Sequence, residues 1–168
     1  ACSVGEWLFW RCRGEEIVVE FATVLALIAV LRATRFSLAV LPLAALTLHC
    51  ASRPRNEAAA WTVHFQQPRL NLFVTGDNTT GTVVGQLFTE NVKDVGRNLF
   101  LCDQTRDGQP VRRSSVDFDS LQPFKAAERY YEQSEQRPAR FFAHAEEDFV
   151  MVSAQPQCDL SWLRSLDD

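Results

Sequence analysis

The sequence predicts an α+β fold, in which helices pack on the faces of an antiparallel β-sheet built as a meander with hairpins. Two observations predict it. Residues 61–118 alternate apolar and polar side chains with the period of strands, and stretches of helical character lie before and after them. Of the 168 residues, 46% are hydrophobic and 23% are charged. These values are typical of a globular protein, so residues 1–168 are expected to form a single domain.

The N-terminus predicts a short β-hairpin. Residues 7–10 and 17–19 have the composition of strands, and Gly14 favours a turn between them. The same segment argues against a secretory signal, because charged residues interrupt it before any apolar core. These residues are Glu6, Arg11, Arg13, Glu15 and Glu16.

Two apolar runs, residues 22–31 and 38–48, are almost free of charge, and each is about ten residues long. Crossing a membrane takes about 20 apolar residues, so we expect two buried helices and no membrane span. The second helix is expected to begin near Leu41, because Pro42 is tolerated only in the first turn of a helix.

Five strands are expected in the middle of the chain. In the first, Trp61, Val63 and Phe65 alternate with polar residues, as in a strand with one buried face. Gly76 favours a turn, and Asp107 followed by a glycine is typical of a tight hairpin. The expected strands cover residues 61–65, 70–74, 82–89, 98–102 and 111–118.

One amphipathic helix and a second group of strands are expected after the sheet. The helix covers residues 121–136, begins at a cap on Asp119 or Ser120, and ends before Pro138. The remaining elements are strands at residues 141–143 and 148–152 and a short helix at residues 160–163.

The cysteines do not have the spacing of a zinc or redox centre, because no two of them form a Cys-x-x-Cys pair. We therefore expect reduced thiols in a reducing compartment, either the cytoplasm or the matrix of a mitochondrion or plastid. Cys102 is expected to be a packed thiol and no nucleophile, since its apolar strand and the neighbouring Asp103 disfavour the thiolate. The cysteines are Cys2, Cys12, Cys50, Cys102 and Cys158.

No metal site is expected. Only His49 and Cys50 are adjacent among the candidate ligands, and neighbouring residues of a helix point in different directions. The other candidates are His64, Cys102 and His144.

Three further patterns have ordinary structural interpretations. Residues 146–148 are acidic and fit a solvated turn better than an acid–base pair. Residues 76–81 lack the ending of a phosphate-binding loop, so we interpret them as a hairpin turn. Trp61, Phe65 and Phe73 could stack on bases, but the net charge of −4 favours core packing and no nucleic-acid partner.

Several segments together resemble the family of the 33 kDa chaperonin, a redox-regulated heat-shock holdase. The most specific is YYEQSEQRPARFF at residues 130–142, which is similar to the end of a helix and the following strand in that family. Residues 70–74, leading into 81–85, resemble its strand–turn–strand unit, and residues 8–15 resemble its N-terminal hairpin. The resemblance covers most of residues 7–156 and implies that family's N-terminal fold.

The departures from the family concern its redox switch. Members carry a C-terminal module whose Cys-x-Cys and Cys-x-x-Cys pairs bind zinc when reduced and form disulfides when oxidised. Residues 1–168 contain no such pairs, so we expect the chaperonin fold without its own switch. Val84 stands where the family usually has an arginine, Arg69 stands in place of its Gly-Pro turn, and Pro42 is also unlike it.

The resemblance implies binding of unfolded or partly folded polypeptides as an ATP-independent holdase, with no enzymatic activity and no cofactor. Leu25, Ile28, Leu41 and Leu46 are the expected polypeptide-binding residues, because an exposed apolar surface supplies affinity without sequence selectivity. The alternative is a structural or assembly subunit of a larger protein complex, in which the apolar helices form a permanent interface. Two further alternatives are open. The protein could form a homodimer, or, as a less favoured alternative, associate with a membrane through its apolar helices.

Overall fold

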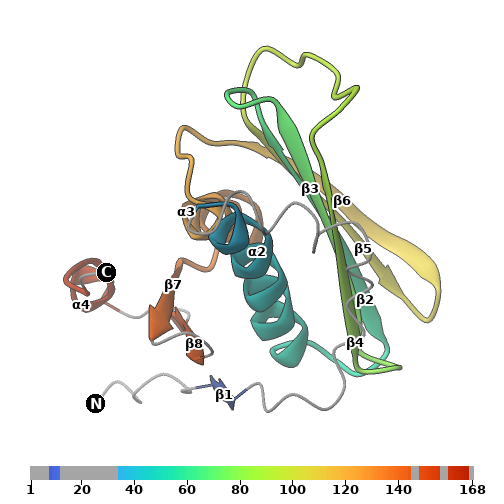
Figure 1. Cartoon of the computed structure of the whole chain (residues 1–168). Coiled ribbons are helices and arrows are strands. Elements are labelled where there is room, and N and C mark those ends of the chain that lie inside the picture. The colour runs from blue at the N-terminus through green and yellow to red at the C-terminus, as the bar shows by residue number, and fades with distance from the viewer. Residues whose placement is uncertain (1–7, 12–33, 145–147, 156–158, 167–168) are drawn as a thin grey trace.

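The computed structural model describes residues 8–11, 34–144, 148–155 and 159–166. Within them, a five-stranded antiparallel sheet, a layer of helices and a small three-stranded sheet follow one another (Figure 1). This arrangement confirms the predicted α+β class. The strands of the larger sheet are β2 (Glu57–Phe65), β3 (Leu70–Asp77), β4 (Thr82–Phe88), β5 (Leu99–Arg106) and β6 (Gln109–Asp117).

The strand order of the larger sheet is β4-β3-β2-β5-β6. The antiparallel hairpins β2–β3, β3–β4 and β5–β6 are confirmed, but the meander is interrupted between β4 and β5, because β5 pairs with β2 and β2 therefore lies in the centre. The long connection from β4 to β5 passes from one side of the sheet to the other. Central β2 is also the most buried strand, which agrees with its run of apolar residues.

The hairpin between β5 and β6 has the geometry that its sequence predicts. Asp107 and Gly108 both have positive φ, at 51° and 73°, and Arg106 lies opposite Gln109. Two consecutive positive φ angles are typical of the tight turn that matches strand twist. A register shift opposite Gln104 and Thr105 leaves Val111 of β6 unpaired, and this bulge bends β6 just after the turn.

One helix, α2 (Thr34–Ala51), lies against the inner face of the sheet, mainly on β3 and β4. It does not begin near Leu41 as expected: Pro42 lies inside it, where the helix lacks one backbone hydrogen bond. The helix is buried on most of its circumference over its second half, because the sheet covers one side and α3 and β8 cover others. The first expected helix, residues 22–31, lies outside the described residues.

The second helical segment consists of α3 (Pro123–Tyr130) continued by the π-helical turn η1 (Tyr131–Glu135). The predicted extent of this helix is confirmed, but the cap is Gln122, and Ser120 instead accepts a hydrogen bond from the Gln122 N–H at 3.0 Å. Proline in the first helical turn, at Pro123, costs no hydrogen bond there. Gln136, with φ 52°, ends η1 in the left-handed conformation.

The small sheet has the order β1-β8-β7 and lies on the far side of the helices from the larger sheet. Its strands are β1 (Leu8–Arg11), β7 (Ala139–His144) and β8 (Asp148–Ser153), and α4 (Ser161–Arg164) follows. The pair β7–β8 and the short C-terminal helix are therefore confirmed. In the expected N-terminal hairpin, β1 is present and pairs with β8, while residues 17–19 lie outside the described residues.

The close contact of α2 with β3 supplies a first testable prediction. A Cβ on Gly76 would lie 2.6 Å from the Cys50 sulfur, so we expect Gly76→Ala to lower the free energy of unfolding by about 1–2 kcal/mol. Urea unfolding followed by circular dichroism measures this. The same substitution in a Cys50→Ala background is the control, because the sulfur is then absent. An equal cost in both backgrounds would contradict the packing argument.

Candidate functional site

The residues expected to bind polypeptides do not form one exposed surface. Leu46 is 0% exposed and lies in the core, with its side chain 3.5 Å from the position of a Cβ on Gly76. Its expected role as an exposed contact is therefore wrong. Leu41 is half-buried and packs against the core, and Leu25 and Ile28 lie outside the described residues.

A buried polar cluster lies at the C-terminal end of α2. The His49 Nδ1 and the Tyr131 hydroxyl share a hydrogen bond of 2.8 Å, and the His49 ring meets the Trp61 ring edge-on at 5.1 Å. Burial, followed by the charge of Arg53, lowers the pKa of His49 to about 3. His49 is therefore neutral at physiological pH and acts as a fixed hydrogen-bonding group of the core.

Glu135, the last residue of η1, accepts hydrogen bonds from several donors in this cluster. The Tyr130 hydroxyl donates to Glu135 Oε1 at 2.5 Å, the Gln104 amide donates at 3.3 Å, and Arg53 forms an ion pair with Oε2. Burial alone would raise the pKa of Glu135, but the Tyr130 hydrogen bond and the Arg53 charge outweigh it and lower this pKa. One carboxylate thus ties the turn after α2, β5 and η1 together.

The two described cysteines are free thiols in the core. Burial raises the pKa of Cys50 to about 12 and that of Cys102 to about 11. Both remain protonated at neutral pH, so the interpretation of Cys102 as a packed thiol is confirmed.

Among the candidate metal ligands, His64 instead shares a 2.7 Å hydrogen bond with Asn71. The described residues contain no group of three or more His, Cys, Asp or Glu placed to hold a metal ion.

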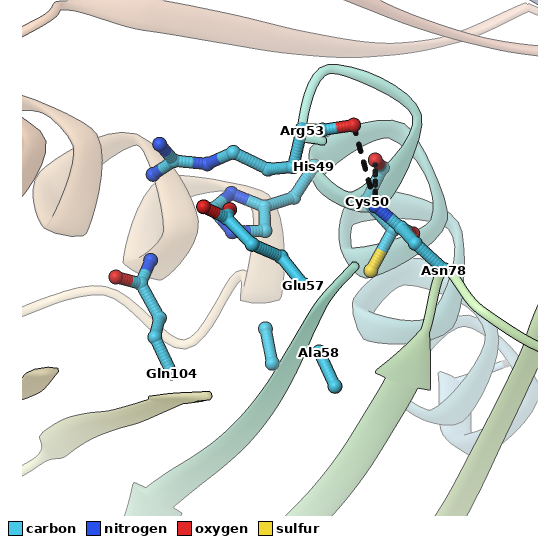
Figure 2. Close-up of a pocket in the computed structure, with 8 residues that line it drawn as sticks. His49, Cys50, Arg53, Glu57, Ala58, Asn78 and Gln104 are labelled. Atoms are coloured by element: carbon cyan, nitrogen blue, oxygen red, sulfur yellow. Dashed lines mark hydrogen bonds between the residues drawn. The ribbon is translucent and has the colours of Figure 1, made fainter. Parts of the chain in front are cut away.

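A small depression lies beside the polar cluster (Figure 2). Asn78 closes one side, because its Nδ2 donates to the carbonyl oxygens of Cys50 at 2.8 Å and Arg53 at 3.4 Å. The space inside is about that of one water molecule. The depression is therefore too small for an organic ligand. It is lined by His49, Cys50, Arg53, Glu57, Ala58, Ala59, Asn78 and Gln104.

The exposed apolar residues of β3 and β4 lie on the outer face of the sheet, away from the helices. Phe73 lies opposite Gln86 in the register of β3 and β4, so it is the diagonal neighbour of both Val84 and Phe88. These three side chains are 37%, 43% and 41% exposed. We call Phe73, Val84 and Phe88 the outer apolar cluster.

The other half of the outer face is charged. Arg113 of β6 forms an ion pair with Asp103 of β5, and Arg97 pairs with Asp117 at 2.9 Å. The outer apolar cluster is therefore concentrated toward the β4 edge and bordered by charge on the β6 side. Such a combination is typical of an interaction surface.

The aromatic residues considered as a stacking platform lie on opposite faces. Trp61 and Phe65 are buried on the inner face, which confirms core packing for these two. Phe73 belongs to the outer apolar cluster, so core packing is wrong for this residue. A signal was present in the sequence: β3 and β4 carry apolar residues at odd and even positions, which places some on each face.

The described helices include none that combines the length and apolarity needed to cross a membrane. 

Among solved structures, a 33 kDa chaperonin (heat shock protein 33 homolog) from Thermotoga maritima is similar, with a TM-score of 0.50 and 15% sequence identity. The fold resembles that of this chaperonin. The match covers 67% of the chain and 47% of the chaperonin, so this chain matches about half the length of that protein. No family model and no curated protein matches the sequence. At this identity the likeness concerns the chaperonin fold and leaves the activity open.

Proposed function

We propose that the protein binds unfolded or partly folded polypeptides as an ATP-independent holdase, through the outer apolar cluster. The observation that carries the proposal is the exposure of Phe73, Val84 and Phe88 together on one face of the sheet. Apolar contact is non-directional, so such a cluster attracts unfolded chains without selecting their sequence. The likeness to a chaperonin fold supports the same activity.

In this proposal the protein catalyses no reaction and needs no cofactor. We expect binding to be independent of redox state, since the two described cysteines, Cys50 and Cys102, are buried free thiols. A reducing compartment, the cytoplasm or an organellar matrix, suits such thiols.

We expect the protein to suppress aggregation of a thermally unfolded test protein equally with and without reductant. Replacing two exposed rings, in Phe73→Ser/Phe88→Ser, is expected to weaken suppression several-fold, because most of the outer apolar cluster is lost. Light scattering at increasing protein concentration measures this.

The matched control is Val111→Ser, which removes an apolar side chain of 57% exposure from β6, outside the outer apolar cluster. It is expected to leave suppression unchanged. Absence of suppression in both redox states would contradict the proposal, and so would equal effects of the two sets of substitutions.

A permanent interface in a larger complex is the second candidate, and the same exposed cluster favours it. A holdase and a subunit of a permanent complex differ in the stoichiometry of binding. A holdase remains a free protein of constant mass in sedimentation and binds many unfolded proteins. A subunit co-purifies with one partner at a fixed ratio, and Phe73→Ser/Phe88→Ser releases that partner.

A further inference from the structure

The β4 edge of the larger sheet is open within the described part of the chain, because β4 has β3 on one side and no described strand on the other. Alternate residues of an antiparallel edge strand direct their N–H and C=O groups away from the sheet. The natural partner for this row of donors and acceptors is the backbone of another extended segment.

The two edges of the sheet differ in how they resist such pairing. At the opposite edge, β6 carries Pro110, Arg112 and Arg113, and the shift between Gln104 and Thr105 bends the hairpin. Proline, charge and bulges are the features that protect an edge strand from pairing. In β4, which reads TVVGQLF, there is no charge and no proline. Only the β4 edge therefore has the composition of a pairing surface.

The side chains of β4 offer apolar contacts on both faces of the sheet. Val84 and Phe88 belong to the outer apolar cluster, while Val83 and Leu87 are half-buried against the core. An added strand would alternate its own side chains beside these two pairs. The best occupant is therefore an uncharged segment with apolar side chains on both faces and without proline.

We propose that β4 binds one extended segment of an unfolded polypeptide as a sixth strand of the sheet. This inference rests on the proposed function and specifies how the client is held. Backbone hydrogen bonds supply affinity that is independent of sequence, and the outer apolar cluster adds contacts beside them. A segment of about seven residues, the length of β4, fills the edge.

The test uses the full chain and a fluorescent eight-residue peptide, two repeats of Val-Val-Thr-Thr with blocked ends, which carries valine on both faces of an extended strand. Its twin carries N-methyl groups on two neighbouring central residues, so that both edges of the peptide lose donors. We expect the twin to bind at least about tenfold more weakly, because one donor that faces β4 is lost and the methyl group in its place blocks close approach of the two backbones. Amide hydrogen exchange of β4 is expected to slow when the unmethylated peptide binds.

Two protein variants locate the binding edge. Val84→Lys places a charge beside the β4 edge and is expected to weaken binding of the unmethylated peptide at least about tenfold. Val111→Lys places the same charge on β6 and is expected to leave binding unchanged. Both valines are exposed, at 43% and 57%, so neither change is expected to disturb folding.

Three results would overturn the inference: equal binding of the two peptides, equal effects of the two lysine substitutions, or protection, before peptide is added, of the β4 amides that point away from β3. The last result would show that the chain itself or a second copy occupies the edge. If no peptide binds but aggregation is still suppressed, strand addition is wrong and the proposed function stands. If peptide binding and suppression are both absent, both are wrong.

Discussion

We expect Trp61→Ala to lower the free energy of unfolding by about 3–5 kcal/mol, the range for a large aromatic residue removed from a packed core. Trp61 is 0% exposed, and its ring lies 5.1 Å from that of Phe100 and 5.9 Å from that of Tyr130. It also contacts His49 of α2. One side chain on the central strand therefore joins the sheet to both helical segments, and its removal would leave a large cavity between them.

Urea unfolding of both proteins, followed by circular dichroism, measures this loss. Phe73→Ala is the matched control, because Phe73 lies on the neighbouring strand but on the outer face, at 37% exposure. We expect it to cost about 1 kcal/mol or less. Similar losses for the two substitutions would contradict the structure, in which Trp61 is buried on the inner face of the sheet and Phe73 is exposed on the outer face.

Much of the larger sheet could be predicted from local signals. The alternation of Trp61, Val63 and Phe65 predicts β2, and Asp107-Gly108 predicts the hairpin that follows β5. These signals act within one strand or one turn. They carry no information on which strands become neighbours, and for this reason the central position of β2 could not be predicted from them.

The error at Leu46 has a related cause. The composition of residues 38–48 shows that the helix is apolar, but it does not show how many layers cover it. In the structure the sheet packs on one side of α2, and α3 and the small sheet lie on the other (Figure 1). An apolar stretch that would be exposed on a two-layer protein is buried in three layers.

The motif at residues 130–142 is accounted for by folding contacts. Tyr130 and Glu135 bind each other, Tyr131 binds His49, and Gln136 ends η1 with a positive φ. These residues hold the end of α2 against the sheet. The most specific part of the resemblance thus has a structural role in this chain, whereas the proposed binding surface lies on other strands.

The contacts of Glu135 predict the second large effect on the free energy of unfolding. We expect Glu135→Ala to lower the free energy of unfolding by about 2–3 kcal/mol, because Arg53 and the Tyr130 hydroxyl lose their acceptor while partly buried. Urea unfolding at pH 7 measures it. The control is Glu132→Ala one turn earlier, where an exposed carboxylate pairs with Arg129 at 2.6 Å. Surface pairs of this kind contribute about 0.5 kcal/mol, so the control is expected to be nearly neutral.

The pH dependence of stability separates the charge of Glu135 from its packing. Its pKa is lowered in the folded protein, so its contribution is fully present above the ordinary value of 4.5 and is lost as pH falls through the folded pKa. In Glu135→Gln the group does not titrate, so we expect a smaller loss of stability between pH 5 and about pH 3 than in the unmodified protein. Parallel losses in the two proteins over this interval would contradict a charged Glu135 as the link between η1 and Arg53, in the turn after α2.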